Sequence, residues 1–365
     1  MKGEHNLRIL GLDIGGANIK AGLVEVSNGR IVECRTTITY LPLWRVGKKK
    51  LAKELQEIST FLSKTDKIDG VGITMTAELS DVFKSKKEGV EYVLRNVESL
   101  WGDIKPLIVD YTGQLIKLEE AYSDYLNVSS ANWAATAKVL TRIFKECILI
   151  DVGSTTTDII PIVNHKVSVV GSTDLERLAT GELIYTGILR SNISSIVHSI
   201  PVKGKETKIA SEIFALSSDV HLILGNISQG EYSTDTADGR GKSLNECLSR
   251  LARIVCSDSD ILGEAEIKKM AHNIYNEQIK KIGNGLKQVW SQSLFEKKLK
   301  ARFPVVTTGL GGKILGKEAA LKLDFRMFSD IGEILGIKDS QVIAAISIAL
   351  LVAENRGEKL VWSTF

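Results

Sequence analysis

Two short segments of the chain share an order of residue types that suits phosphate binding. Residues 10–20 read L-G-L-D-I-G-G-A-N-I-K, and residues 149–159 read L-I-D-V-G-S-T-T-T-D-I. In each, an aspartate (Asp13 or Asp151) ends an apolar run, and one aliphatic residue separates it from a glycine. Glycine lets the backbone approach an anion, successive N–H groups can bind it, and the aspartate can hold a hydrated divalent cation. The repetition predicts a duplicated fold that grips a phosphate between its halves.

A third glycine turn, Gly309-Leu310-Gly311-Gly312, follows the apolar run at residues 304–308. In order along the chain, the three turns resemble the two phosphate loops and the adenosine loop of the actin, sugar-kinase and hexokinase superfamily. That resemblance implies an α/β fold of two actin-like lobes, a duplicated ribonuclease H-like ATPase fold with a cleft between the lobes. Neither a Walker A motif nor G-x-G-x-x-G occurs at these turns, which weighs against P-loop and Rossmann folds.

Each turn taken alone is also typical of a hairpin without a ligand, and either aspartate could simply cap its turn. The position of Asp13 and Asp151 directly before the glycine turns favours the metal role, so both are predicted to be catalytic and to bind Mg²⁺. Lys20, in the return strand of the first hairpin, is predicted to be a surface residue. The predicted diphosphate ligands are Gly15, Gly16, Asn18, Gly153, Ser154, Thr155, Thr156, Gly309, Gly311 and Gly312.

Length and composition indicate an ordinary globular protein. A chain of 365 residues favours two domains, and 44% of its residues are hydrophobic. A net charge of +3 is too small to indicate binding to nucleic acid or to a membrane surface. Four scattered cysteines without C-x-x-C spacing favour a reducing compartment and argue against a zinc site. With neither a signal sequence nor a membrane-spanning stretch recognised, a cytoplasmic location is predicted.

Alternating and helical patterns of apolar residues predict the elements that position the turns. Strands are predicted at residues 8–12, 20–26, 31–39, 69–74, 107–110, 147–151, 159–163, 167–170 and 304–308. Helices are predicted at residues 49–62, 131–144, 175–188, 211–215, 244–254, 261–299 and 342–354. The first lobe is assigned residues 1–145 plus 336–365, and the second lobe residues 146–335. The alanine-rich helices at 131–144 and 342–354 suit a hinge between lobes, but ordinary core helices explain them equally well.

Longer stretches of the sequence indicate a narrower family within this superfamily. The distinctive ones are residues 72–81, 86–90, 130–133, 171–177, 180–187, 235–240 and 250–253. Together they resemble the archaeal hydantoinase/oxoprolinase-like proteins linked to one-carbon carriers, and among them the condensing enzymes of methanofuran biosynthesis. The resemblance runs essentially end to end. It implies a transferase that joins an (aminomethyl)furan-methyl diphosphate to γ-glutamyltyramine, with the phenol oxygen displacing diphosphate.

The residues suit that chemistry. Mg²⁺ held by Asp13 and Asp151, with N–H groups of the turns, would neutralise the departing diphosphate. A carboxylate could accept the phenol proton. The candidates are Glu78, Asp81, Asp235 and Asp238, of which Glu78 and Asp238 are taken as catalytic, with Asp13 left open. Arg177 and Arg240 are predicted to bind substrate anions, and Trp133 to contact the ring substrates, although Trp133 also suits a core position.

Two other functions compete with this interpretation. An ATP-dependent kinase, or an ATP-using hydrolase of the hydantoinase/oxoprolinase type, would explain the adenosine-like turn. A scaffold of actin type is disfavoured because it would need neither aspartate. The predicted partners are therefore small-molecule substrates, without nucleic acid or membrane, and a homo-oligomer is left open.

Overall fold

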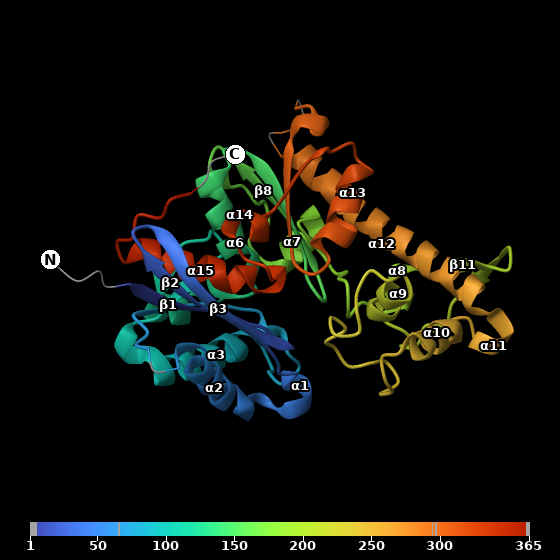
Figure 1. Cartoon of the computed structure of the whole chain (residues 1–365), viewed down its shortest axis with the longest axis horizontal. Helices are drawn as coiled ribbons and strands as arrows, with labels where there is room; N and C mark the ends of the chain where they lie inside the picture. The colour runs from blue at the N-terminus through green and yellow to red at the C-terminus, as the bar shows by residue number, and fades with distance from the viewer. Residues whose placement is uncertain (1–5, 65, 294, 296–297, 363–365) are drawn as a thin grey trace. The chain divides into compact units, whose positions relative to one another are not determined.

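The computed structural model describes residues 6–64, 66–293, 295 and 298–362 (Figure 1). The chain divides into two compact units. Unit 1 comprises Met1–Cys147, Ile160–Arg177 and Ile331–Phe365, and unit 2 comprises Ile148–Ile159 and Leu178–Asp330. The lobe boundaries predicted from the sequence stay a prediction.

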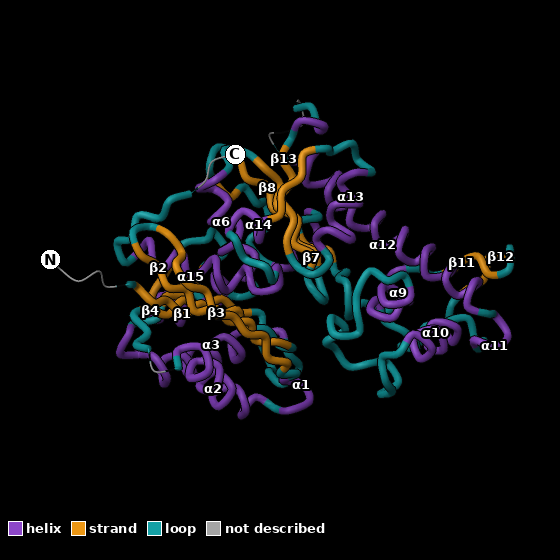
Figure 2. Tube along the Cα trace, viewed as in Figure 1, coloured by secondary structure: helices purple, strands orange, loops and turns teal. Residues whose placement is uncertain are grey.

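Unit 1 is built on a six-stranded sheet in the order β3-β2-β1-β4-β5-β6 (Figure 2). Its strands are β1 (Leu7–Ile14), β2 (Asn18–Ser27), β3 (Arg30–Tyr40), β4 (Gly70–Met75), β5 (Leu107–Val109) and β6 (Leu115–Lys117). The strands β1, β2 and β3 form an antiparallel meander, whereas β1, β4 and β5 run parallel. The register places Asp13 opposite Lys20 of β2 and beside Thr74 of β4.

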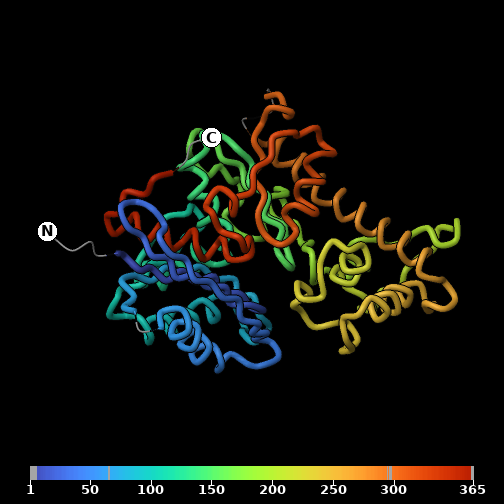
Figure 3. The backbone as a smooth tube through the Cα atoms, viewed as in Figure 1, coloured from blue at the N-terminus to red at the C-terminus, as the bar shows by residue number. Residues whose placement is uncertain are grey.

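Helices cover both faces of this sheet. The apolar residues of α2 (Leu51–Ser63) and α3 (Lys86–Trp101) form one core with Leu10, Leu12 and Ile14 of β1. The helix α15 (Ile343–Asn355) packs on the other face, beside Ile9 of β1, and Figure 3 shows its red trace against the blue strands. The approach is close enough that a Cβ added to Gly11 would lie 1.9 Å from the carbonyl oxygen of Ala345. The remaining helices of five or more residues in unit 1 are α4 (Leu118–Ser123), α6 (Asn132–Ile143) and α14 (Ile331–Leu335).

Unit 2 contains most of a second sheet, in the order β10-β8-β7-β13-β14, with β9 paired to β8. Its strands are β7 (Cys147–Val152), β8 (Thr157–Val163), β9 (Lys166–Val167), β10 (Leu183–Ile184), β13 (Pro304–Thr308) and β14 (Met327–Asp330). The strands β7, β13 and β14 run parallel, and the division between the units falls inside β7 and β8. The register sets Thr308 beside Asp151.

The rest of unit 2 is largely helical, and the 29-residue helix α12 is its longest element. The helices are α8 (Ile193–Ile196), α9 (Ser217–Ile223), α10 (Leu244–Arg253), α11 (Ser259–Leu262), α12 (Glu264–Gln292) and α13 (Lys317–Leu321). A small hairpin of β11 (Ser199–Val202) and β12 (Lys205–Lys208) packs against α12. The helix α7 (Asp174–Thr180) spans the boundary between the units.

Most predicted elements are confirmed, and the errors have physical causes. The helix predicted at 175–188 ends at Thr180, because Gly181 has a φ of +78° and the following residues join the sheet as β10. The helix predicted at 211–215 is wrong: α9 begins at Ser217, where the side chain of Asp219 accepts the N–H of Leu216 and caps the helix. The helix predicted at 261–299 is shorter, because Gly263 (φ +77°) separates α11 from α12, which ends at Gln292.

The two alanine-rich helices, α6 and α15, both belong to unit 1 and pack against each other, so their small side chains serve close packing. A hinge role for these helices stays a prediction. Within the residues that the structure describes, no helix has both the length and the apolar composition needed to cross a membrane.

Candidate active site

The carboxyl ends of β1 and β4 lie side by side in unit 1 and bring the first predicted turn to the distinctive stretch at residues 72–81. The N–H of Thr76 donates to the carbonyl of Ile14 at 2.9 Å, and the turn after β1 is closed by the N–H of Gly15 donating to Asn18 at 2.9 Å. A Cβ on Gly16 would lie 3.9 Å from Cα of Ala77. The carboxyl ends of parallel strands are where open α/β sheets bind their ligands.

Asp13 is the buried carboxylate of this edge, with 3% of its surface exposed. Its Oδ2 atom lies 3.3 Å from Nζ of Lys20, and its Oδ1 atom has no hydrogen-bond partner in the described part of the chain. A buried carboxylate oxygen without a donor suits a hard cation such as Mg²⁺, which prefers oxygen ligands. Lys20 is therefore more than the surface residue expected. The short hairpin turn fixes its register opposite Asp13, and that signal was available in the sequence.

Glu78 follows β4 in the short 3-10 helix η2 (Ala77–Leu79) and is 2% exposed. Its Oε1 atom accepts hydrogen bonds from the hydroxyls of Ser129 and Ser130, each at 2.8 Å. Its Oε2 atom is buried and lacks a hydrogen-bond partner among the described residues. Burial raises the pKa of this carboxyl above its usual range, although the two serine hydroxyls oppose the shift. Gly89 of α3 holds η2 in place, since a Cβ there would lie 2.5 Å from Cα of Glu78.

The other distinctive stretches of unit 1 gather around the same residues. Trp133, three residues after Ser130, stacks on Arg177, whose guanidinium carbon lies 4.1 Å from the ring centroid. Both side chains are buried, each about 1% exposed, which gives Trp133 the core position that the sequence left open. Lys86 at the start of α3 pairs with Asp174 at 3.0 Å. Four stretches far apart in the sequence are thus assembled within unit 1.

The second phosphate-type turn and the third glycine turn lie together in unit 2, at the carboxyl ends of β7 and β13. The N–H of Gly153 donates to Thr156 at 2.9 Å, and the N–H of Gly311 donates to Val152 at 3.0 Å. A Cβ on Gly187 would lie 2.5 Å from the backbone nitrogen of Thr155. Gly309, with a φ of +78°, passes so close that a Cβ would lie 2.7 Å from Oδ1 of Asp151.

A buried polar network that the sequence did not reveal supports the Gly187 segment. Nε2 of Gln278 donates to the carbonyl of Gly187 at 2.7 Å and to Oγ1 of Thr186 at 3.0 Å. The Oε1 atom of Gln278 lies 3.1 Å from Nε2 of His221. Burial lowers the pKa of His221 to about 4, although its hydrogen bond to Oε1 of Gln278 opposes the shift, so the imidazole is neutral near pH 7. A lone histidine and a lone glutamine carry no motif that would have predicted this contact.

The structure places Asp238 and Arg240 in another part of unit 2. Oδ1 of Asp238 lies 3.1 Å from Arg250, and its Oδ2 lies 3.0 Å from Arg253. Partial burial would raise the pKa of Asp238, but the N–H of Arg240 and the two arginines outweigh it and lower that pKa. Arg250 is fully buried and also binds Asp219 at 2.8 Å, so these contacts hold the loop before α10. Arg240 is exposed.

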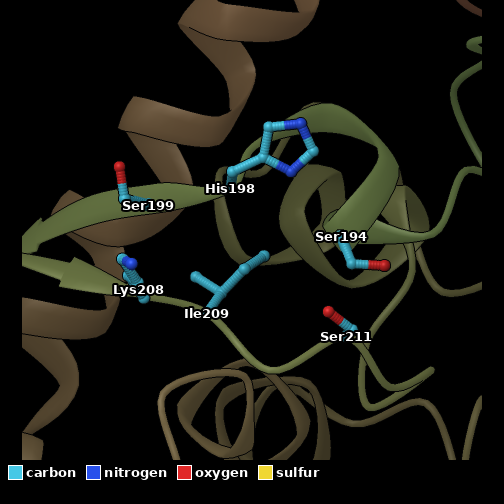
Figure 4. A pocket seen from close by; sticks show the side chains of 6 residues that line it. All are labelled: Ser194, His198, Ser199, Lys208, Ile209 and Ser211. Atoms are coloured by element: carbon cyan, nitrogen blue, oxygen red, sulfur yellow. The ribbon is translucent and has the colours of Figure 1, made fainter.

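The predicted site residues therefore form two groups. Unit 1 holds Asp13, Gly15, Gly16, Asn18, Glu78, Trp133 and Arg177. Unit 2 holds Asp151, Gly153, Ser154, Thr155, Thr156, Asp238, Arg240, Gly309, Gly311 and Gly312. None of these residues lines the surface pocket of about 330 Å³ beside the β11–β12 hairpin (Figure 4). That pocket is lined by Ser194, His198, Ser199, Lys208, Ile209 and Ser211.

Comparisons with known proteins show which families the chain resembles. Residues 69–356 match the Hydantoinase/oxoprolinase family. A protein of Methanocaldococcus jannaschii named (4-{4-[2-(gamma-L-glutamylamino)ethyl]phenoxymethyl}furan-2-yl)methanamine synthase is 38% identical over 350 residues, which cover 96% of this chain and 98% of the relative. A Methanococcus vannielii protein with the same name is 37% identical over 223 residues, covering 60% of this chain and 96% of that relative.

A solved structure confirms the predicted fold class. Nucleotide-free acetone carboxylase superimposes with a TM-score of 0.55 at 10% identity, covering 94% of this chain and 70% of that one. The fold is the α/β, two-lobed actin-like ATPase fold.

Proposed function

Because the chain belongs to the hydantoinase/oxoprolinase family and, within it, to the family of (4-{4-[2-(gamma-L-glutamylamino)ethyl]phenoxymethyl}furan-2-yl)methanamine synthases, we propose that it forms the ether bond of that product. The phenol oxygen of γ-glutamyltyramine would attack the methylene carbon of an (aminomethyl)furan-methyl diphosphate. The carbon–oxygen bond to diphosphate breaks as the ether bond forms. Diphosphate leaves with the bonding electrons, and the phenol proton passes to a carboxylate or to solvent. The observation that supports this proposal most strongly is the 38% identity to the named synthase over 96% of this chain.

The glycine turns are proposed to bind the diphosphate. In unit 1, Gly15 and Gly16 end β1 beside Asp13, and in unit 2 the turn from Gly153 to Thr156 follows Asp151. Asp13 and Asp151 are proposed to hold Mg²⁺, a role that the partnerless Oδ1 atom of Asp13 supports within the described chain. When bound, Mg²⁺ neutralises charge that develops on a departing diphosphate. Lys20, whose Nζ atom lies 3.3 Å from Oδ2 of Asp13, fixes the orientation of that carboxylate.

The two carboxylates predicted to accept the phenol proton differ in their surroundings. Asp238 is paired with two arginines and has a lowered pKa, which makes it the weaker proton acceptor. Glu78 has the raised pKa that a proton acceptor needs. Its role depends on which part of the substrate its partnerless oxygen faces.

The test is the reaction without nucleotide. Purified protein is incubated with Mg²⁺, the furanmethyl diphosphate and γ-glutamyltyramine, and the ether and diphosphate are measured by mass spectrometry. Product without ATP is expected. Product only with ATP would instead support a kinase or an ATP-using hydrolase. Asp13→Asn should lower the rate of ether formation at least about 100-fold. The matched control Asp103→Asn, which alters an exposed aspartate of unit 1, should match the wild type.

A further inference from the structure

We infer that Glu78 is the counter-charge for the primary ammonium group of the furan substrate, an assignment that rests on the condensing function proposed above. The product named for the relatives is a methanamine, that is, a furan bearing a CH₂–NH₂ group. An alkyl amine of this kind has a pKa near ~10, like that of lysine, and is cationic near pH 7. A furanmethyl diphosphate that carries it presents an anion on one side of a small ring and a cation on the other.

Among the residues that the structure describes, none forms an ion pair with the buried carboxylate of Glu78. Its side chain is 2% exposed, and its Oε2 atom has no hydrogen-bond partner within the described chain. Lys86 is the cation whose charge acts on Glu78, but only as the weakest influence on its pKa, and Lys86 is already paired with Asp174 at 3.0 Å. Buried ionised groups are normally paired, so the partner that this carboxylate lacks is expected in the ligand.

The serine hydroxyls favour ion pairing over proton transfer. Ser129 and Ser130 both donate to Oε1 of Glu78 at 2.8 Å, which stabilises the ionised carboxylate and fixes its orientation. Ser130 has a positive φ of +54°, an uncommon conformation for a serine, and it brings this hydroxyl to Glu78. These donors oppose the rise in pKa that burial causes in Glu78, and they suit a carboxylate that binds a cation through its other oxygen.

Glu78 also lies close in the chain to the turn proposed to bind the diphosphate. Ala77, its neighbour in η2, lies against Gly16 of the first phosphate-type turn, with its Cα 3.9 Å from a Cβ added there. Glu78 is the residue that follows Ala77, in the same short helix.

The experiment compares two substrates in two proteins. The wild type and Glu78→Gln are given the aminomethyl furanmethyl diphosphate or its 5-methyl analogue, which lacks the amine, with saturating γ-glutamyltyramine. We expect the wild type to prefer the aminomethyl substrate by about 100-fold or more in kcat/KM, because the analogue leaves Glu78 unpaired. Glu78→Gln should lose most of this preference. Its kcat/KM should fall with the aminomethyl substrate, whereas its kcat/KM with the analogue should stay within about threefold of the wild type. The matched control Glu91→Gln, which alters a partly exposed glutamate of α3, should keep the full preference.

Other results overturn the inference. Equal losses with both substrates in Glu78→Gln would assign Glu78 to proton transfer or to folding, and a wild type without preference would also refute the pairing, even if the variant failed to fold. Failure of the proposed reaction is scored separately. If the wild type forms no ether, binding of furan-2-ylmethanamine is measured by calorimetry, and equal affinity for wild type and Glu78→Gln would overturn the inference, whereas selective loss in the variant would uphold it.

Discussion

The glycine turns offer the sharpest test, because the structure separates glycines needed for packing from glycines that leave room for a ligand. A Cβ added to Gly16 would lie 3.5 Å from Cβ of Ser80, and one added to Gly153 would lie 3.6 Å from the carbonyl oxygen of Thr156. Both are ordinary van der Waals contacts, and neither glycine has a φ in the left-handed region. A Cβ on Gly187, in contrast, would lie 2.5 Å from the backbone of Thr155.

Substitutions of these glycines should therefore affect stability and activity differently. Gly16→Ala and Gly153→Ala should unfold with an unchanged free energy or one raised by about 0.4–1 kcal/mol, because alanine restricts the unfolded chain. Gly187→Ala should lose about 1–3 kcal/mol through overpacking. If the turns bind diphosphate, the new methyl group obstructs one or two N–H donors, each worth about 1.5–3 kcal/mol to a charged group. At about 1.4 kcal/mol per factor of ten, kcat/KM should then fall about 10- to 100-fold or more in Gly16→Ala and Gly153→Ala.

Urea unfolding and diphosphate release measure the two effects on the same samples. Gly283→Ala is the matched control: it lies inside α12, where an added Cβ meets no atom closer than 3.9 Å, and it should be at least as stable as the wild type with full activity. Wild-type kcat/KM in both Gly16→Ala and Gly153→Ala would refute the proposed diphosphate site. Clear destabilisation of either variant would refute the steric argument.

Three further predictions use independent contacts. Asp13→Asn and Asp151→Asn should each lower kcat at least about 100-fold while thermal unfolding stays within a few degrees of the wild type, and wild-type turnover in both would remove the metal proposal. Arg250→Met should lower the free energy of unfolding by about 3–5 kcal/mol in urea, because it strands a fully buried carboxylate, whereas Arg253→Met, at a partly exposed pair, should cost less than about 1 kcal/mol. The pKa of His221 is about 4 in the folded protein and near ~6.5 in the unfolded chain, so the unfolded chain binds the proton first as the pH falls. The free energy of unfolding should therefore fall by about 3 kcal/mol between pH ~6.5 and pH 4. In His221→Gln, urea unfolding over the same pH range should show a smaller loss.

The fold was predictable because its signals are local. The hairpin of β1 and β2, the strand β13 and the helix α15 each follow an apolar pattern that is complete within one element. The errors arose where tertiary contacts override such patterns. Residues 183–184 continue a helical pattern but pair with β8, and the short hairpin of β11 and β12 has polar residues that carry no strand signal.

Of the candidate site, only the glycine turns and their aspartates could be predicted from the sequence. Asp13 and the glycines follow from strand-turn-strand patterns, and the register that pairs Asp13 with Lys20 follows from the length of one turn. The contacts around Glu78 could not be predicted in this way. Its two serine donors lie 51 and 52 residues further along the chain, and no periodicity connects segments at that separation. What the sequence does show is that 72–81 and 130–133 are both distinctive. A physical reason follows from burial: a carboxylate buried without a cation is costly, so the residues that bury it and fix its orientation must be specified together, and in our proposal a ligand supplies the missing charge.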